Sequence, residues 1–491
     1  MSTTTTIVRS VSLRGKETAS PPELNPDTRY WGEPDIQVDG TEGNGAYYKG
    51  NFLPTNPAIP KEHEKYWRKS PYWNYFKSVW GDAPMADTNF ELWLRGFFKD
   101  FTLPRHPAQG QTTKGLPAWL HYFSSKYDQF MGGAQMEMFN TLSDQQKAEA
   151  FKIAQGMIDI PPTMLTLDEP EHTKYRSLVS KLFTGGQVKK SEADVRAVIQ
   201  KNILEMKGLG KIDFMELFAF PVPLEIISDR LGIPRDTKSR EFFYEAATSA
   251  ASALKMAPVP PEQILGRMQT AVDLQKFLIE LVEACRRAPQ DNMISILSNS
   301  KLTEEDGERE LTHGEILSVL NQFLVAGHET TASTFGWAML VLCDNPELED
   351  QLRGDEGRIK TFVEEVLRFE APVQGLPRVV ARDTELGGYT LKKGDVMMLR
   401  YGAANRDERQ FSEPDKINIH REKAGMQMAF GSGVHFCIGA PLARQELNIG
   451  FYELLQNYKN FRLDPDRGRP VADPSFILRA LPELRITYQS V

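Results

Sequence analysis

The segment 311–343, LTHGEILSVLNQFLVAGHETTASTFGWAMLVLC, is predicted to form one long helix that is apolar on nearly every face. A helix without a polar face must be covered on all sides, so it belongs in the middle of a large domain. The polar sequence GHETT at 327–331 interrupts the apolar pattern abruptly and needs a separate explanation. We therefore expect a single large, mainly helical domain, although 491 residues would suggest about three domains by length alone.

The rest of the chain is expected to add further helices and a small β-rich part. Apolar residues recur at helical spacing over 168–206 and 235–290, and residues 376–401 are typical of a hairpin with turn signals at Gly387 and Gly394. Residues 1–60, rich in Thr, Gly, Pro and Asn, are expected to form an extended arm packed on the body, which spans 61–491. Six of the seven tryptophans lie between Trp31 and Trp119, where they form either ordinary core or part of a pocket for a large apolar ligand.

Charge and cysteine content exclude several classes of protein. Asp and Glu outnumber Lys and Arg by 66 to 58 and no basic block stands out, so no nucleic-acid partner is expected. The three cysteines, Cys285, Cys343 and Cys437, are too few and too far apart for a disulfide scaffold or a zinc site. The N-terminal sequence lacks the apolar stretch of a secretory signal, and no run of about 18 apolar residues could cross a bilayer, so we expect a soluble, cytoplasmic protein.

The sequence AFGSGVHFCIGAPLARQE at 429–446 carries the strongest chemical signal, with Phe430, Gly433, Cys437 and Gly439 at fixed offsets. The glycines would let the loop turn so that backbone N–H groups point at the sulfur, and the helix that starts at PLARQE would direct its N-terminal dipole there. Both effects lower the pKa of a thiol. A lone thiolate with one open face suits the single axial ligand of a haem iron. The alternative is a buried, inert cysteine, which would not require the flanking glycines.

This segment resembles the haem-binding loop of the cytochrome P450 family, the haem-thiolate monooxygenases. The resemblance extends from about Asp168 to the C-terminus, through four motifs in the family's order. It implies the cytochrome P450 fold, which is mainly α with a small β-rich side, and haem b (iron protoporphyrin IX) as the cofactor. By the same resemblance Cys437 is the iron ligand, and Phe430 and Gly439 contact the cofactor.

The second motif is AGHETT at 326–331, the polar interruption of the long helix. Glycine costs about 1 kcal/mol relative to alanine in a helix interior, so Gly327 needs a reason, and room for dioxygen is the one we expect. By resemblance, the Thr330 hydroxyl hydrogen-bonds the bound dioxygen, Glu329 belongs to the proton-delivery path and Ala326 borders the haem. Taken alone, Thr330 would more simply donate back to the carbonyl of Ala326.

The third motif is Glu365 and Arg368, an acid–base pair at i, i+3 on one helix face. It resembles the family's ExxR pair, which anchors the fold near the proximal side of the haem. A third partner usually comes from a later segment, which here reads EPDKI and places Lys416 where an arginine is common. The completing residue is therefore either Lys416 or another side chain.

The fourth motif concerns the haem propionates, which require cations or hydrogen-bond donors. His172 and Arg176 stand at i, i+4 in DEPEHTKYRSLVSKLF and so share a helix face. Arg378, and His435 just before the cysteine, match two further propionate contacts of the family.

The substrate pocket is expected to be mostly apolar, which implies an apolar or amphipathic small molecule. By resemblance, its lining comes from three segments: Asn321, Leu324, Val325 and Ala326 on the long helix, residues 373–376, and a late turn at Phe476 and Ile477. Gln374 and Asn321 are the possible polar anchors, although both more readily serve the structure. The aromatic-rich first 160 residues depart from the family's usual pattern and have no assigned role.

The reaction consumes dioxygen and two electrons, yet the sequence carries no flavodoxin-like part, no GxGxxG fingerprint and no cysteine set for an iron–sulfur cluster. Electrons are therefore expected from a separate ferredoxin with its reductase, or from a flavodoxin. Lys174, Lys181 and Arg444 would form a local basic docking patch, or else simply a solvated face.

We accordingly predict a monooxygenase that inserts one oxygen atom into an apolar small molecule by hydroxylation or O-dealkylation. Alternatives are a haem-thiolate peroxygenase or an enzyme of oxidative coupling or rearrangement, and, in a different class, a non-catalytic haem sensor or carrier. Glu329 and Thr330 disfavour the use of peroxide, because a proton relay is superfluous when peroxide supplies reduced oxygen. The substrate, the position oxidised, the redox partner and the oligomeric state are not determined by the sequence.

Overall fold

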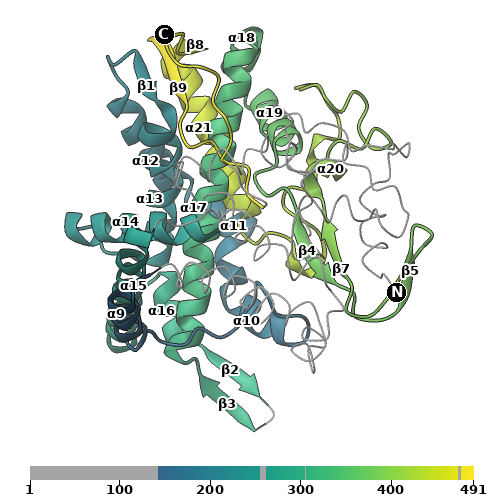
Figure 1. Ribbon diagram of the computed structural model, residues 1–491. Helices are drawn as coiled ribbons and strands as arrows, with labels where there is room; N and C mark the ends of the chain where they lie inside the picture. The colour runs from purple at the N-terminus through teal and green to yellow at the C-terminus, as the bar shows by residue number, and fades with distance from the viewer. Residues whose placement is uncertain (1–141, 255–260, 305, 474–476) are drawn as a thin grey trace.

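The computed structural model describes residues 142–254, 261–304, 306–473 and 477–491. The predicted arm at 1–60 and the tryptophan-rich region up to Trp119 lie outside the described residues. Within them the chain forms a body of packed helices with small antiparallel sheets, as the sequence predicts (Figure 1).

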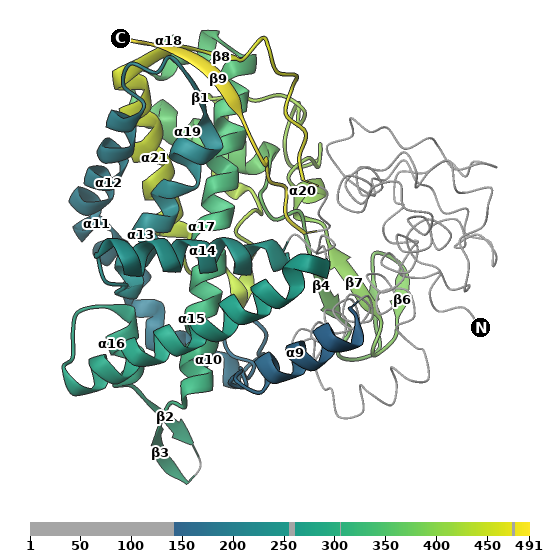
Figure 2. The same ribbon diagram turned by 60° about the vertical axis from the view of Figure 1, so that its left-hand side comes forward.

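The predicted long helix forms as α17, His313–Asp344, and runs through the middle of the body (Figures 1 and 2). It begins at a capping box: the Thr312 hydroxyl accepts from the Glu315 N–H, and the Glu315 carboxylate accepts from the Thr312 N–H. From Gly314 to Cys343 its side chains are buried except at several positions between 321 and 330. Four of those positions, Gln322, Ala326, Gly327 and Thr330, line a cavity, so the polar interruption falls where the helix borders open space.

Helices surround α17 on several sides, and α13, α14, α15, α16, α19 and α21 contact it. Figure 2 shows α14 and α15 crossing it. The helical spacing predicted over 168–206 and 235–290 is confirmed by α10 to α12 and by α14 and α15. The other α-helices are α9 Asp144–Ala154, α10 Glu171–Ser180, α11 Gly185–Lys190, α12 Glu192–Glu205, α13 Pro221–Leu231, α14 Thr237–Leu254, α15 Pro261–Arg287, α16 Met293–Ser298, α18 Glu347–Leu352, α19 Glu356–Phe369, α20 Tyr401–Ala404 and α21 Ala440–Asn457.

Short single turns complete the helical part. They are the 3₁₀ turns η3 Lys181–Phe183, η5 Ala424–Met426 and η6 Gly433–His435, and the π-helical turn η4 Met215–Ala219.

The strands form four small antiparallel sheets. One has three strands in the order β1-β9-β8, and the others are the pairs β2–β3, β4–β7 and β5–β6. The hairpin predicted at 376–401 forms as two nested pairs, with Gly387 and Gly388 at φ 57° and 81° in the inner turn. The strands are β1 Lys211–Asp213, β2 Lys301–Glu304, β3 Gly307–Glu310, β4 Leu376–Val379, β5 Thr384–Leu386, β6 Tyr389–Leu391, β7 Val396–Leu399, β8 Tyr458–Leu463 and β9 Arg485–Ser490.

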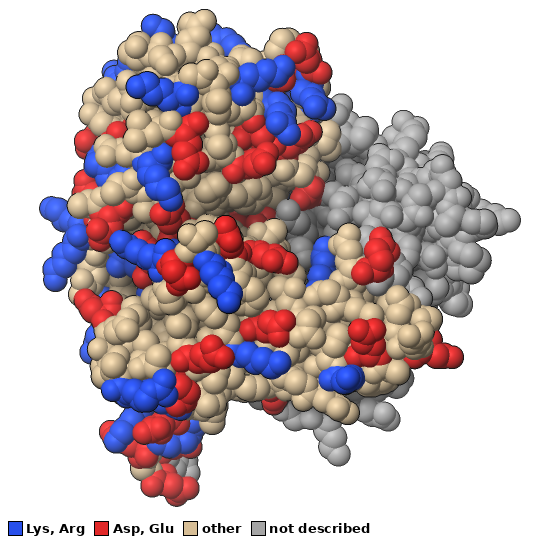
Figure 3. Space-filling view, turned by 90° about the vertical axis from the view of Figure 1, so that its left-hand side faces the viewer, with Lys and Arg blue, Asp and Glu red and all other residues tan. Residues whose placement is uncertain are grey.

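The surface carries charges of both signs. On the face shown in Figure 3, Lys and Arg are interspersed with Asp and Glu. Among the residues that the structure describes, we find no helix with both the length and the apolarity needed to span a bilayer.

Candidate active site

The loop that carries Cys437 is closed by its own backbone. The Cys437 N–H donates to the carbonyl of Phe430 at 2.9 Å, and Gly431 N–H donates to Met428 at 2.9 Å. Gly431 and Gly433 adopt φ 70° and 73°, a left-handed conformation that side chains other than glycine rarely tolerate. Helix α21 begins directly after this loop, so its N-terminus lies beside the sulfur, as predicted.

The acidity of this thiol differs from the sequence prediction. Burial raises the pKa of Cys437. The backbone N–H groups of Gly439 and Ala440 and the charges of Arg176 and Arg444 act to lower this pKa, but their effect is smaller than that of burial. The predicted donors are therefore present, but the predicted lowering of the pKa is wrong for the polypeptide itself, because desolvation of the thiolate outweighs them. A coordinated metal ion would deprotonate the thiol outright.

Cys437 borders a cavity of about 280 Å³ that also reaches α17. Eight of the ten predicted site residues line it, so the structure brings together segments far apart in the sequence. They are Arg176, Ala326, Thr330, Arg378, Phe430, His435, Cys437 and Gly439. The two others, His172 and Glu329, are buried just behind the lining.

Imidazole and guanidinium groups gather at one edge of this cavity. The rings of His172 and His435 lie 4.3 Å apart, and the Nε2 atom of each is buried without a hydrogen-bond partner among the described residues. Arg176 and Arg378 line the cavity near them. Burial, together with the charges of His172 and Arg378, lowers the pKa of His435 to about 4 in the polypeptide itself, and the arginines are the fixed positive charges at this edge.

Thr330 and Glu329 occupy different environments. The Thr330 hydroxyl borders the cavity and donates to the Ala326 carbonyl at 3.0 Å, which is the alternative considered from the sequence. This bond leaves the hydroxyl oxygen free to accept a hydrogen bond from a ligand. Glu329 is buried, with its Oε2 atom 3.8 Å from Nε2 of His328, a neighbour that the sequence analysis did not consider.

The structure gives Gly327 a packing role that the sequence analysis did not consider. A Cβ atom at this position would lie 2.7 Å from Cγ1 and 2.9 Å from Cδ1 of Ile227 on α13, so the close packing of α13 against α17 requires a glycine. Gly327 also lines the cavity, and the space expected there for dioxygen stays a prediction.

Of the four residues of α17 predicted to face the substrate, Ala326 lines the cavity, whereas Asn321, Leu324 and Val325 do not. The residues of α17 that line it are Gln322, Phe323, Ala326, Gly327, Thr330 and Thr331. Val373 and Leu376 line it as predicted, and the Gln374 amide donates to the Ala371 carbonyl, a structural role. Ile477 is buried away from the cavity, and Phe476 lies outside the described residues. Tyr401, Met164 and Leu165 also line it, and the last two belong to the segment before His172 that the resemblance places over the distal face.

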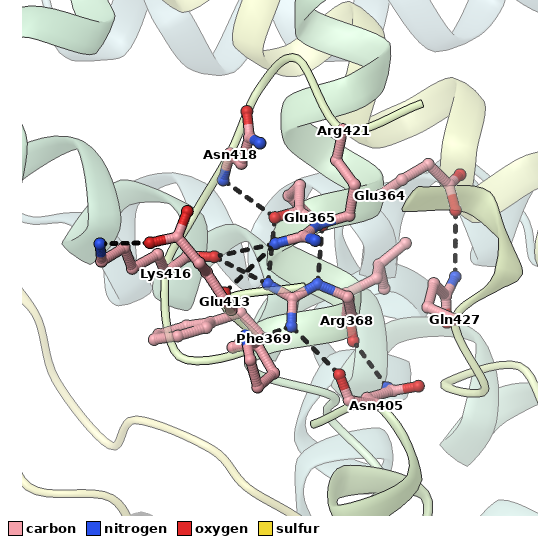
Figure 4. Close-up of polar contacts among 12 residues, drawn as sticks. Glu364, Glu365, Arg368, Phe369, Asn405, Glu413, Lys416, Asn418, Arg421 and Gln427 are labelled. Carbon is pink, nitrogen blue, oxygen red and sulfur yellow. Dashed lines mark hydrogen bonds and ion pairs between the residues drawn. The ribbon is translucent and has the colours of Figure 1, made fainter. Parts of the chain in front are cut away.

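Glu365 and Arg368 on α19 are fully buried and form a bidentate ion pair, with N···O distances of 2.7 and 3.0 Å (Figure 4). The third member is Arg421, whose Nε donates to Oε1 of Glu365 at 2.7 Å. The Lys416 side chain instead pairs with Glu413 at the surface, and only its carbonyl reaches Arg368. The question left open by the sequence is thus settled in favour of an arginine later in the same loop.

Arg368 also connects this ion pair to the cysteine loop. Its remaining N–H groups donate to the carbonyls of Asn405, Pro414 and Lys416, so all five of its donors are used. The Asn405 side chain in turn accepts from the Met428 N–H at 2.6 Å. The buried arginine therefore fixes the backbone on which the loop around the cysteine is built.

The basic patch expected near the cysteine loop is largely neutralised. Lys174 pairs with Glu171 at 2.7 Å, and Arg444 forms an ion pair with Glu364. Lys181 is exposed. Ion pairing of this kind weakens the case for a strongly basic docking patch at these positions.

The Cytochrome P450 family model matches residues 117–488 of this chain. The chain belongs to the cytochrome P450 family. A curated relative, Cytochrome P450 107B1 of Saccharopolyspora erythraea, is 32% identical over 363 residues, which cover 72% of this chain and 85% of the relative.

Solved cytochrome P450 structures share the fold. P450BioI, in complex with an acyl carrier protein ligated to hexadec-9Z-enoic acid, matches with a TM-score of 0.60 and 30% identity over 70% of this chain and 84% of that chain. CYP109E1 from Bacillus megaterium, in complex with testosterone, matches with a TM-score of 0.59 and 30% identity over 67% and 87% of the two chains. The predicted cytochrome P450 fold is therefore confirmed.

Membership of the family makes the chain an oxygen-incorporating oxidoreductase with a haem cofactor. The residues present fit a haem. A single thiol lies on the cavity wall. Two buried imidazole nitrogens that make no hydrogen bond among the described residues lie near two arginines, although His435 Nε2 is 3.8 Å from Oδ1 of Asp168. This arrangement suits the carboxylates of the haem.

Proposed function

We propose that the chain is a haem b monooxygenase that inserts one atom of dioxygen into an apolar small molecule, by hydroxylation or O-dealkylation. The observation that carries this proposal is that the Cys437 thiol and the Thr330 hydroxyl border the same cavity. A ligand for the iron and a group able to hold a proton are thus available in one place. The haem domain is taken to span 61–491, with 1–60 as an extended arm.

Cys437 is the proposed iron ligand, with Phe430 and Gly439 next to it and Ala326 facing the cofactor from α17. When bound, a haem with a cysteine thiolate ligand supplies the chemistry that cleaves the O–O bond. His172, Arg176, Arg378 and His435 are proposed to bind the propionates. The two buried imidazole nitrogens that make no hydrogen bond among the described residues support this assignment.

Glu329 is proposed to deliver protons to the cavity, and Thr330 is proposed to hold them there. The Thr330 hydroxyl donates to the Ala326 carbonyl, and its oxygen can accept a hydrogen bond from the reacting oxygen species in the cavity. The buried Glu329 carboxylate lies 3.8 Å from the His328 imidazole, so the proposed proton exchange between them would run through a bridging water. Protons would then reach the cavity through Glu329 and be held there by Thr330.

The substrate is proposed to be an apolar or amphipathic molecule. The walls around Thr330 are largely apolar and include Met164, Leu165, Phe323, Val373 and Leu376. The fatty acyl group and the steroid named for the two solved relatives have the same character. Electrons are proposed to come from a separate ferredoxin with its reductase, or from a flavodoxin.

Replacement of Cys437 by serine tests the proposal, with Cys343→Ser as the matched control. Cys343 is buried, and burial raises its pKa to about 12, so it serves as an inert thiol. The reduced, CO-treated wild type and the Cys343 variant should show the red-shifted Soret band of thiolate-ligated haem, and Cys437→Ser should lose it. A wild-type band at the position of imidazole-ligated haem, or an unchanged spectrum in Cys437→Ser, would contradict the proposal.

A further inference from the structure

Three polar residues, Glu315, Ser318 and Gln322, form a stripe along the otherwise apolar helix α17. Their spacing of i, i+3 and i+7 places them on one helix face. Each bonds to a side chain outside the helix: Glu315 accepts from the Tyr175 hydroxyl at 2.6 Å, and the other two contact Thr163. Glu315 and Ser318 are buried and Gln322 is partly buried, and all three have hydrogen-bond partners in other segments, which indicates a specific contact between α17 and those segments.

Residues 155–167, here called the wall segment, form most of the connection between α9 and α10. Thr163 in this segment contacts Ser318 and Gln322 of α17. The Gln275 amide on α15 holds it, accepting from the Ile158 N–H at 2.8 Å and donating to the Ile158 carbonyl at 3.2 Å. It also passes close to the start of α17, because a Cβ atom on Gly314 would lie 2.3 Å from the Asp159 carbonyl oxygen. The wall segment is therefore fixed on two helices.

Gln322 holds the end of the wall segment. Its Nε2 donates to the Thr163 hydroxyl at 2.6 Å, and its Oε1 accepts from the Leu165 N–H at 3.1 Å. The Ser318 hydroxyl lies 3.0 Å from the Thr163 hydroxyl. Thr163 is fully buried and Ser318 nearly so. The Gln322 Nε2 also lies 3.3 Å from the Ser318 hydroxyl, so the three side chains form one connected network around the buried Thr163 hydroxyl.

Met164 and Leu165 line the cavity, whereas Thr163 and Ser318 do not. We propose that Thr163, Ser318 and Gln322 form a polar clamp, and that this clamp positions Met164 and Leu165 and so sets which ligands the cavity accepts. The inference rests on the proposed function, because the cavity in question is the one proposed for haem and substrate. Thr163 is the positioning residue of the clamp, since it acts only through its neighbours in the wall.

The turn geometry explains why the clamp can act on these two side chains. The N–H groups of Thr166 and Leu167 both donate to the Thr163 carbonyl, at 3.1 and 3.0 Å. The Leu165 N–H lies inside this turn and is taken by Gln322 instead. The turn can shift along α17 only if that bond breaks, so the clamp holds the positions of the Met164 and Leu165 side chains.

The test compares two ligands that bind a haem iron through nitrogen, imidazole and 4-phenylimidazole. Imidazole is small, whereas the phenyl group of the second ligand must fit between the cavity walls. The dissociation constant of each is measured from the shift of the Soret band in the full-length haem-loaded protein. The ratio of the two dissociation constants measures how well the cavity walls accommodate the phenyl group. The dissociation constant of imidazole alone measures whether the haem iron still binds a small nitrogen ligand.

The decisive pair of variants is Thr163→Val, which keeps the shape and removes the hydroxyl, and Thr163→Ser, which keeps the hydroxyl. Ser298→Ala is the control, because its buried hydroxyl only donates to the Ile294 carbonyl within α16. Thr163→Val removes both hydrogen bonds of the hydroxyl and should change the ratio by about fivefold or more. Thr163→Ser and Ser298→Ala should keep the wild-type ratio, and all variants should keep the wild-type imidazole constant.

An unchanged ratio in Thr163→Val would overturn the clamp, as would an equal change in Thr163→Ser. If Thr163→Val does not retain haem, Ser318→Ala decides instead, because it removes the other hydroxyl of the same contact. An unchanged ratio in Ser318→Ala would then overturn the proposal. Failure of the wild type to bind imidazole with a Soret shift would contradict the proposed function, and is distinguishable from failure of the clamp.

Discussion

Replacement of Arg421 by methionine should strongly destabilise the fold, although the sequence motif points to Lys416. The Arg421 guanidinium is 7% exposed and donates to the fully buried Glu365 at 2.7 Å, and to the Ser412 carbonyl at 2.7 Å. Removing one partner of a buried ion pair typically costs about 3 to 5 kcal/mol. Because Glu365 keeps Arg368, we expect about 2 to 3 kcal/mol, at or just below the lower end of that range.

Urea unfolding of the haem-loaded protein, followed by far-UV circular dichroism and by the Soret band, measures this change. Lys416→Met is the matched control, because the Lys416 side chain is 72% exposed and pairs only with the exposed Glu413, so no measurable change is expected. Arg421→Lys should recover only part of the loss, since an ammonium group cannot replace the planar fork of guanidinium donors.

The haem content of the purified variants adds a second readout. The buried ion pair connects to the cysteine loop through Arg368 and Asn405, so Arg421→Met should also retain less haem per chain. The reasoning would be refuted if Arg421→Met unfolded at the wild-type urea concentration. It would equally be refuted if Lys416→Met were destabilised as much.

Three further predictions follow from the packing and the site. Gly327→Ala should lower the free energy of unfolding by about 1 to 3 kcal/mol, because its Cβ would overlap Ile227. Gly266→Ala, in open space on α15, should raise it by about 0.5 to 1 kcal/mol, and urea unfolding measures both changes. Burial alone would raise the pKa of Glu315, but hydrogen bonds lower it from 4.5 to about 2, so the stabilisation it gives is complete above pH 4.5 and is lost as the pH falls through about 2. The difference in unfolding free energy between wild type and Glu315→Gln should therefore shrink between pH 6 and pH 3, and a constant difference would contradict this assignment. Thr330→Ala should lower product formed per electron pair by about tenfold or more and release hydrogen peroxide instead, and unchanged coupling would argue against its proton-holding role.

Local sequence determined much of the site, because each motif depends on residues close together in the chain. The positive-φ glycines and the helix start around Cys437 form a self-closing loop, and the pair Glu365 and Arg368 lies on one turn of one helix. The apolar run at 311–343 likewise determined a central helix. These features follow from helical spacing and from backbone conformations that only certain residues adopt.

The choice among equivalent partners was decided by tertiary structure. Lys416 and Arg421 lie in the same loop, and only the path of that loop decides which of them reaches the buried Glu365. Which face of α17 borders the cavity depends on how α13 and the other segments pack against it, so the sequence placed Asn321, Leu324 and Val325 on the lining where the structure has Gln322 and Phe323.

The pKa of Cys437 illustrates the same division. The sequence determined which donors would face the sulfur, since they belong to its own loop and to the helix that follows. The extent of burial depends on every segment packed around the loop, and the desolvation that results outweighs the local donors. Hydrogen-bond partners near in sequence can be read from the chain, whereas burial and side-chain partners distant in sequence are properties of the assembled fold.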